Sequence, residues 1–265
     1  MGNPAGSFIW YELMTTDPDA AQDFYGKVVG WQIVGTPEPD AAVDYRHIIR
    51  SDGSSNGGVL KLTDDMCAGG ARPCWMGYLY VEDVDAAVDV IVADGGKMLL
   101  PAFDLEVGRI AMMADPQGVP IYIMTPIPPA GVEDPTSDVY DRFEVQHVSW
   151  NELYSPDIDG AKAFYSRHFN FEFNESMPMG EMGDYCFIDH GGQTIGAMMQ
   201  KPPQLPMGLW NYYIRVADLD KAVEAVKAGG GQVLNGPMEV PGGDRIINGM
   251  DPQGAPFSLV AAGTE

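Results

Sequence analysis

The chain has 265 residues, with 15 Lys and Arg against 38 Asp and Glu, so its formal net charge is −23. Binding to nucleic-acid phosphates or to anionic lipid depends on clustered cations, so this balance argues against both kinds of partner. The hydrophobic fraction of 45% is enough to form a core, which argues against a disordered acidic chain.

The first predicted elements follow a β-α-β-β-β order. Residues 8–14 alternate in character and carry Trp, Tyr and Ile, which predicts a strand. Asp17-Pro18 is a typical helix start, and Gly30 ends the helix that follows. Three further strands are expected near residues 31–34, 45–49 and 58–62.

The same order then repeats. Residues 75–81 predict a strand, Asp85 opens a helix, and that helix stops at Gly95. Strands are expected near residues 97–100, 110–113 and 121–124. The Pro-rich stretch from Thr125 to Asp138 predicts an extended linker, because proline fixes φ and lacks a backbone donor.

The whole pattern returns in the second half of the chain. Trp10 and Glu12 recur as Trp150 and Glu152 at an offset of 140, and the segment 115–120 recurs as 251–256 at an offset of 136. The sequence therefore predicts two homologous repeats, residues 1–125 and 141–265, around a linker over residues 126–140. The expected fold class is α+β, with four βαβββ modules in tandem.

Three motifs carry a resemblance to a known family. They are Asp-Pro-x-Ala-Ala-x-x-Phe-Tyr at 17–25, Val-Glu-Asp-Val-Asp-Ala-Ala at 81–87, and Asp-Pro-Gln-Gly before the last strand of each repeat. With these motifs the chain resembles the vicinal oxygen chelate superfamily of glyoxalase I, extradiol dioxygenases and bleomycin resistance proteins. It is most similar to two-domain bacterial glyoxalase-like proteins. The resemblance implies two open, curved-sheet barrels with the helices outside.

The resemblance also implies three metal-ligand positions in each repeat, occupied in metal-dependent members by two histidines and a glutamate. Matching the motifs places these positions at Trp10, Met76 and Tyr122, and again at Trp150, Asn211 and Ser258. None is a carboxylate or an imidazole, so neither a metal nor another cofactor is expected. One alternative is a relocated metal site that keeps glyoxalase I-type lyase or extradiol-type dioxygenase chemistry. Its ligands would come from Glu12, Glu152, His47 and His147.

Without metal ligands, the expected pocket is lined by aromatic and thioether side chains. Such a lining favours an aromatic or apolar organic ligand, although the same side chains could simply fill the barrel. The expected ligand-binding residues are Trp10, Met76, Tyr122, Trp150, Asn211, His47, Arg109 and Arg245.

Glu12 and Glu152 are the candidate catalytic residues. A carboxylate facing an apolar cavity has a raised pKa and can act as a general acid or base. The other interpretation is a structural glutamate. Arg109 and Arg245 either neutralise these glutamates as a buried pair or bind a ligand carboxylate. His47 is a titratable group at a position that the second repeat fills with Phe187.

Three cysteines, Cys67, Cys74 and Cys186, make an odd number, and no signal peptide or membrane-length apolar run is evident. We therefore expect a cytoplasmic protein, and four modules in one chain favour a monomer or a weak homodimer. The expected partner is a small molecule. The sequence leaves open whether the chain sequesters this molecule or transforms it as an isomerase, lyase or hydrolase.

Overall fold

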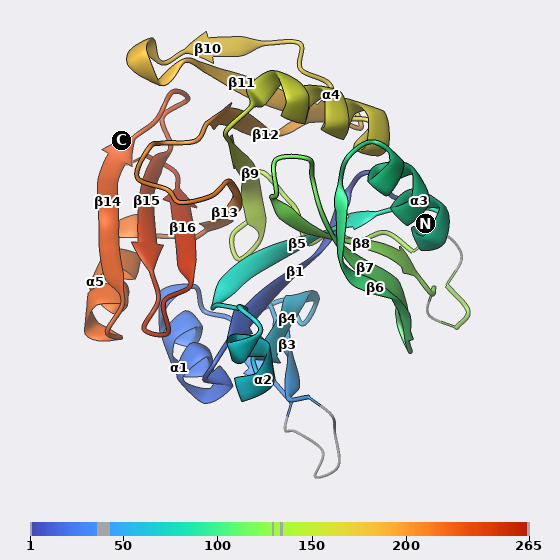
Figure 1. Cartoon of the computed structure of the whole chain (residues 1–265). Helices are drawn as coiled ribbons and strands as arrows, with labels where there is room; N and C mark the ends of the chain where they lie inside the picture. Colours follow the sequence, from blue (N-terminus) through green and yellow to red (C-terminus); the bar gives the residue numbers. More distant parts are fainter. Residues whose placement is uncertain (1, 36–42, 129, 133–134, 264–265) are drawn as a thin grey trace. The chain divides into compact units, whose positions relative to one another are not determined.

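A computed structural model describes residues 2–35, 43–128, 130–132 and 135–263 of the chain. These residues form two eight-stranded mixed sheets, and helices accompany each sheet (Figure 1). Each repeat contributes one sheet, and each sheet consists of two βαβββ modules. The predicted α+β class and the four modules are therefore confirmed.

The first sheet has the strand order β2-β3-β4-β1-β5-β8-β7-β6. Its strands β1 and β4 are parallel, as are β5 and β8, whereas the hairpins within each module are antiparallel. The elements of this repeat are β1 (Phe8–Thr15), α1 (Pro18–Val28), β2 (Gln32–Val34), β3 (Tyr45–Ile49), β4 (Ser55–Lys61), α2 (Asp64–Ala68), β5 (Cys74–Tyr80), α3 (Val84–Ala93), β6 (Lys97–Leu105), β7 (Gly108–Ala114) and β8 (Pro120–Pro126).

The second sheet repeats this arrangement in the order β10-β11-β12-β9-β13-β16-β15-β14. Its elements are β9 (Val148–Ser155), α4 (Ile158–Phe169), β10 (Ser176–Pro178), the 3-10 helix η1 (Gly180–Met182), β11 (Asp184–His190), β12 (Gln193–Gln200), β13 (Leu209–Arg215), α5 (Leu219–Ala228), β14 (Gln232–Glu239), β15 (Arg245–Met250) and β16 (Pro256–Ala261).

The main departures from the predicted elements are local. The short helix α2 was not predicted, and β8 continues through Pro126, which the sequence had assigned to the linker. Proline has no backbone N–H to donate, so Pro126 can occupy the last position of strand β8, where no such donor is needed. Residues 129, 133 and 134 of the predicted linker lie outside the described part of the chain.

The chain forms two compact units, and each unit contains parts of both repeats. One comprises Met1–Ile9, Met76–Asp138 and Trp150–Trp210, and the other comprises Trp10–Trp75, Val139–Ser149 and Asn211–Glu265. The first unit therefore holds the second and third modules almost entirely, and the second unit holds the first and fourth. Below, these are called unit 1 and unit 2.

An aspartate caps the long helix of each module. Its side chain accepts a hydrogen bond from the amide of the third residue on, which satisfies one of the free donors in the first helical turn. In each module the helix packs on strands of its own module, as α3 does on β6, β7 and β8 (Figure 1). The four caps are Asp17, Asp83, Asp157 and Asp218.

A buried hydrogen-bond relay joins the two repeats within unit 2. The indole Nε1 of Trp75 donates to the hydroxyl of Tyr25 at 3.0 Å, and this hydroxyl donates to Oδ2 of Asp251 at 3.1 Å. The other carboxylate oxygen of Asp251 accepts the amides of Gln253 and Ala255. The repeated Phe-Tyr and Asp-Pro-Gln-Gly motifs thus hold the helix of one repeat to a turn of the other.

Unit 1 contains the matching relay. Trp210 Nε1 donates to the Tyr165 hydroxyl at 3.0 Å, which donates to Asp115 Oδ2 at 3.3 Å. Burial raises the pKa of Asp115 to about 6, against the opposing effect of the Val119 and Gln117 amides that bond to it. Burial also raises the pKa of Asp251. Both carboxyl groups are therefore harder to ionise in the folded chain than in the unfolded one.

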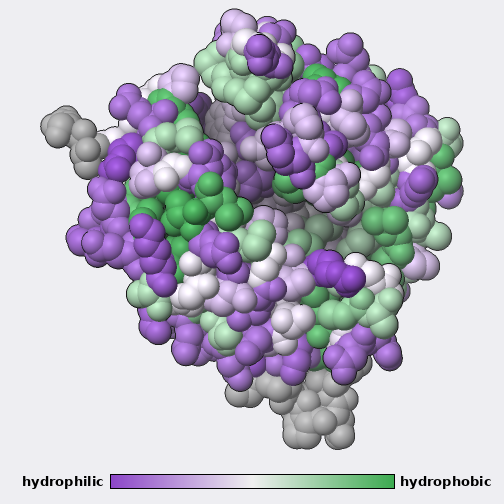
Figure 2. Space-filling model, turned by 60° about the vertical axis from the view of Figure 1, so that its left-hand side comes forward, coloured by the Kyte–Doolittle hydropathy of each residue, from purple (hydrophilic) through white to green (hydrophobic). Residues whose placement is uncertain are grey.

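Hydrophilic residues cover most of the face drawn in Figure 2, and hydrophobic residues occupy smaller areas between them. This agrees with an acidic chain whose charged side chains lie at helix starts and in turns. Among the described residues, no helix is long and apolar enough to cross a membrane.

Candidate functional site

In unit 1, four side chains form a row across the last four strands of the first repeat. The strand registers align Tyr78 of β5 with Tyr122 of β8, Tyr122 with Met112 of β7, and Met112 with Leu100 of β6. The rings of Tyr78 and Tyr122 are stacked, with centroids 4.3 Å apart and planes 13° apart. We call these four residues the apolar row.

The apolar row changes from buried to exposed along its length. Tyr78 and Tyr122 are buried, Met112 is half-buried, and Leu100 is 37% exposed. Ile110 and Phe103 form the next aligned pair on these strands, and Phe103 is also 37% exposed. Aromatic and methionine side chains of this kind make a flat, polarisable surface that accepts apolar ligands of varied shape.

In unit 2, the second repeat places a row of different chemistry at the equivalent positions. The registers align Tyr213 of β13 with Ser258 of β16, Ser258 with Asn248 of β15, and Asn248 with Asn235 of β14. We call these four residues the polar row. Compared with the apolar row, Ser258 replaces Tyr122, Asn248 replaces Met112, and Asn235 replaces Leu100.

Also in unit 2, a group of side chains gathers on strands β1 and β3 of the first repeat. Trp10 Nε1 donates to the Tyr45 hydroxyl at 2.9 Å, and the ring of His47 lies edge-on to both, 6.1 Å from Trp10 and 5.7 Å from Tyr45. A Cβ atom at Gly58 would lie 2.0 Å from the Tyr45 hydroxyl oxygen, so a glycine is needed to admit this ring. Trp10 and His47, both expected among the ligand-binding residues, therefore lie next to each other.

Glu12 lies two residues beyond Trp10 on β1 and is 2% exposed. It aligns with Gly58, which in turn aligns with His47, so a carboxylate and an imidazole share one row across three strands. The charge of Glu12 together with burial raises the pKa of the Cys74 thiol to about 11, and burial is the larger cause. Cys74 is thus a poor nucleophile at neutral pH.

Unit 1 contains the corresponding group of the second repeat. Trp150 Nε1 donates to the Tyr185 hydroxyl at 2.8 Å, and this hydroxyl donates to Oε1 of Glu152 at 2.7 Å. Phe187 stands where the first repeat has His47, and it contacts both Trp150 and Tyr185 edge-on. Glu152 is therefore bonded to a tyrosine hydroxyl, which favours the structural interpretation of this glutamate.

Arg109 and Arg245 do not pair with the strand glutamates, which corrects the predicted buried ion pairs. Arg109 bonds to Asp85 of α3 and Asp104 of β6, and Arg245 bonds to Asp220 of α5. Successive side chains of a strand point to opposite faces, so Arg109 lies on the helix-bearing face of β7 while Met112 lies on the other. Aspartates of α3, β6 and α5, not Glu12 or Glu152, therefore compensate these guanidinium groups.

The residues present do not fit a divalent transition metal. The six positions matched to metal ligands hold aromatic, thioether, amide or hydroxyl side chains, whereas iron, nickel or zinc sites use imidazole, carboxylate or thiolate groups. Across the described ranges, no three His, Cys, Asp or Glu side chains gather closely enough to hold a metal ion.

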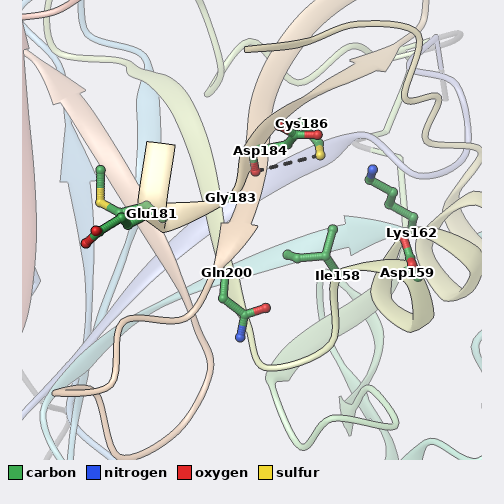
Figure 3. Close-up of a pocket in the computed structure, with 9 residues that line it drawn as sticks. Ile158, Asp159, Lys162, Glu181, Gly183, Asp184, Cys186 and Gln200 are labelled. Atoms are coloured by element: carbon green, nitrogen blue, oxygen red, sulfur yellow. Dashed lines mark hydrogen bonds between the residues drawn. The ribbon is translucent and has the colours of Figure 1, made fainter. Parts of the chain in front are cut away.

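A separate pocket of about 290 Å³ lies in unit 1 between helix α4 and strands β11 and β12 (Figure 3). Its lining carries one cation, Lys162, and several acidic side chains. Cys186, which also lines it, is buried, and its thiol donates to the carbonyl oxygen of Asp184 at 3.8 Å. This pocket contains none of the residues that the sequence predicted for a site.

The sequence predicted Met76, Tyr122 and Asn211 as site residues but did not single out most of the residues that lie beside them. Met76 is buried on β5, two residues before Tyr78, and Asn211 accepts a hydrogen bond from the Ser258 hydroxyl at 2.9 Å. Aligning the two repeats would have pointed to these positions, because it pairs Tyr122, Met112 and Leu100 with the polar residues Ser258, Asn248 and Asn235. The missed residues are Tyr45, Tyr78, Leu100, Met112, Tyr185, Tyr213, Asn235 and Asn248.

Comparison with known proteins identifies the family. The family model described as Glyoxalase/Bleomycin resistance protein/Dioxygenase superfamily matches residues 7–123 and again residues 144–259. The chain belongs to this superfamily. A protein of Mycobacterium bovis named "Putative glyoxylase CFP32" is 32% identical over 258 residues, covering 95% of this chain and 93% of that protein.

Other similar proteins differ in their named roles. The "Anthracycline biosynthesis protein DnrV" of Streptomyces peucetius is 27% identical over 276 residues, covering 96% of this chain and 93% of its own. Among solved structures, the Mn(II)-bound glyoxalase from Novosphingobium aromaticivorans has a TM-score of 0.63 at 17% identity, over 98% of this chain and 83% of that one. The 2,3-dioxygenase LapB from Pseudomonas sp. KL28 has a TM-score of 0.63 at 14% identity, over 100% and 94%. These two structures support the fold alone.

Proposed function

We propose that this protein binds a small, flat and largely apolar organic molecule on the face that carries the apolar row. The observation that carries the proposal is the continuous line of Tyr78, Tyr122, Met112 and Leu100, which leads from buried stacked rings to exposed aliphatic side chains. Apolar lining with a buried and an open end is typical of small-molecule sites. The name of the relative from Streptomyces peucetius, an anthracycline biosynthesis protein, supports an aromatic ligand.

Titration of the protein with 1,8-dihydroxyanthraquinone, a neutral planar probe, tests this proposal. Isothermal titration calorimetry should give saturable binding. Met112→Asn, which copies Asn248 of the polar row, replaces an apolar contact by a polar amide. It should weaken the affinity by about tenfold, which corresponds to about 1.4 kcal/mol. Asn248→Met is the matched control and should leave the affinity unchanged. Equal affinity of the wild type and Met112→Asn would contradict the proposal.

We also propose that binding at the apolar row uses no transition metal. The support is the identity of the side chains at the six matched positions, none of which is a usual ligand for such metals. Elemental analysis of protein purified without chelators should find less than stoichiometric iron, nickel, zinc and manganese. A stoichiometric metal that resists dialysis would instead support a lyase or dioxygenase with relocated ligands.

Acid–base catalysis is a second candidate function, and one observation favours it. Glu12 and His47 share a row on β1, β4 and β3, so the first repeat brings a carboxyl group and an imidazole, both of which can act as general acids or bases, to one row. The second repeat has Phe187 in place of the imidazole and a Glu152 carboxylate that is already bonded to Tyr185. In this proposal Glu12 takes a proton from a bound substrate, and His47 supplies one.

Native mass spectrometry of the purified protein gives the mass of any compound that copurifies with it. Acid–base catalysis by Glu12 and His47 is then tested on that compound. Glu12→Gln should abolish turnover of that compound and change its affinity by less than about threefold. His47→Phe, which copies the second repeat, should reduce turnover. A wild-type protein that binds the compound without converting it would support sequestration instead.

A further inference from the structure

The edge strand β6 of unit 1 exposes apolar side chains along its whole length. It is the last strand of the first sheet, with β7 on one side and no other described strand on the other (Figure 1). We call residues 97–107 the β6 edge. A continuous apolar surface of this kind indicates an interaction site, whereas single exposed apolar residues are common. The large apolar residues of the β6 edge, each at least 37% exposed, are Met98, Leu99, Leu100, Phe103, Leu105 and Val107.

The fold does not require this apolar edge. The equivalent strand β14 of the second repeat has Asn235 where β6 has Leu100. The turn after β14 is Pro-Gly-Gly-Asp at 241–244, whereas the turn after β6 is Glu-Val-Gly at 106–108. Both edge strands nevertheless pair antiparallel with the strand that follows them. The apolar character of the β6 edge is therefore a property of the first repeat and not of the shared framework.

A partner that extends the sheet by one strand does not fit the β6 edge. Pro101 lies in the middle of the strand and has no N–H to donate. The pairing of β6 with β7 is also irregular on both sides of Leu100. Proline and bulges of this kind hinder the addition of a further strand to a sheet edge. The partner must therefore bind through side chains.

The charges at the two ends of the β6 edge have opposite signs. Lys97 begins the strand and Glu106 directly follows its last residue, and both are exposed. Neither side chain forms an ion pair with any other residue of the described ranges. Asp104, by contrast, is compensated by Arg109 at 2.8 Å. The segment thus offers one unpaired cation and one unpaired anion, with apolar residues between them.

This order of residues makes the β6 edge complementary to itself. When two copies lie antiparallel across a two-fold axis, Lys97 of each copy comes opposite Glu106 of the other. The same arrangement brings Met98 of one copy opposite Leu105 of the other, so apolar residues meet apolar residues. A two-fold dimer needs such a surface, because the same residues contribute to the contact from both copies.

We propose that the β6 edge binds a second copy of this chain and forms a two-fold homodimer. The net charge of −23 on each copy opposes association, so the expected dimer is weak and reversible. The proposal does not depend on ligand binding at the apolar row, although Leu100 belongs to both surfaces.

Sedimentation velocity of the full chain over a series of concentrations tests this proposal, and it should show a monomer–dimer equilibrium. Leu105→Asn should raise the dissociation constant about tenfold, because a polar amide replaces an apolar contact. Leu234→Asn is the matched control and should leave the constant unchanged, since it makes the same exchange at an exposed position of β14. Both leucines are exposed, so neither variant should change the thermal unfolding midpoint.

A charge exchange tests the antiparallel arrangement itself. Lys97→Glu and Glu106→Lys each place like charges opposite one another, so each should raise the dissociation constant by about threefold to tenfold. The double variant restores opposite charges at both contacts and should recover the wild-type constant.

Three outcomes would overturn the proposal. One is a wild-type chain that stays monomeric up to about 1 mM. Another is a dimer whose dissociation constant is the same in Leu105→Asn and in the wild type. The third is a double charge variant that dimerises as weakly as the single variants, because the two β6 edges would then not lie antiparallel to each other.

Discussion

The apolar row and the polar row occupy equivalent strands of two repeats and present opposite chemistry. Both begin at a buried tyrosine, Tyr78 or Tyr213, and both end at an exposed residue of an edge strand. Between these ends, Tyr122 and Met112 of the apolar row correspond to Ser258 and Asn248 of the polar row. The difference shows that the βαβββ framework accepts rows of opposite polarity at the same strand positions.

The largest expected effect comes from removing the stacked ring. Tyr122→Ser gives the apolar row the residue of the polar row at a position that is 4% exposed. Loss of a buried aromatic side chain leaves a cavity, so the free energy of unfolding should fall by about 3–5 kcal/mol. Urea denaturation measures this change. A fall of less than about 1 kcal/mol would show that the stacked pair does not hold the strands together.

The Trp–Tyr–Asp relays are the same in both repeats and should give both units a pH response of the same direction. The pKa of Asp115 is about 6 in the folded chain and about 3.9 when unfolded, so the folded state binds more protons between these values. The contribution of Asp115 to the free energy of unfolding should therefore fall by roughly 3 kcal/mol as the pH rises from about 4 to about 6, and should change no further above that. Asp251 contributes in the same direction.

Asp115→Asn separates the contribution of Asp115 from that of the surface carboxylates. Paired surface carboxylates stabilise the fold less as the pH falls, so their effect has the opposite sign. Urea denaturation at a series of pH values gives the difference between the wild type and the variant. The free energy of unfolding of the wild type should fall relative to that of Asp115→Asn between pH 4 and pH 6. Parallel curves across this range would contradict an elevated pKa for Asp115.

A smaller effect is expected for the carboxylate held by Tyr185 in the third module. The Tyr185 hydroxyl bonds to Glu152 at 2.7 Å, so Tyr185→Phe and Glu152→Gln should be coupled. A double-mutant cycle should give a coupling free energy of about 1–2 kcal/mol. Coupling near zero would contradict the structural interpretation of Glu152 and favour the catalytic one.

The smallest effect is expected at the exposed ends of the two rows. Leu100→Asn and Asn235→Leu exchange the residues of the two edge strands, and each should change the free energy of unfolding by less than about 0.5 kcal/mol. Chemical denaturation checks this directly. Effects on ligand binding at these positions would then reflect contact with the ligand and not a change in the fold.

The modules were predictable because their signals are local. The strand over residues 8–14, the helix start at Asp17-Pro18 and the turn at Asp-Pro-Gln-Gly each depend on a few neighbouring residues. The repeat then confirmed each of them a second time. The short helix α2 has no such support, since its five residues bury nothing.

The rows were harder to predict because they depend on strand register. In β6, irregularities between Met98 and Leu100 and between Leu100 and Phe103 shift the pairing with β7. Each extra residue changes which side chains face the row, so simple alternation along residues 97–105 does not identify Leu100. The Tyr25–Asp251 and Tyr165–Asp115 contacts were out of reach for another reason, because they join residues 226 and 50 positions apart.

These relays have a consequence for how the chain came to have two different rows. Tyr25 of the first repeat bonds to Asp251 of the second, and Tyr165 of the second bonds to Asp115 of the first. Two separate copies of a single repeat would make the same reciprocal contacts across a two-fold axis. In such a homodimer every substitution appears twice, so both rows must be identical. Joining the copies in one gene removes that constraint, and each row can then change independently of the other.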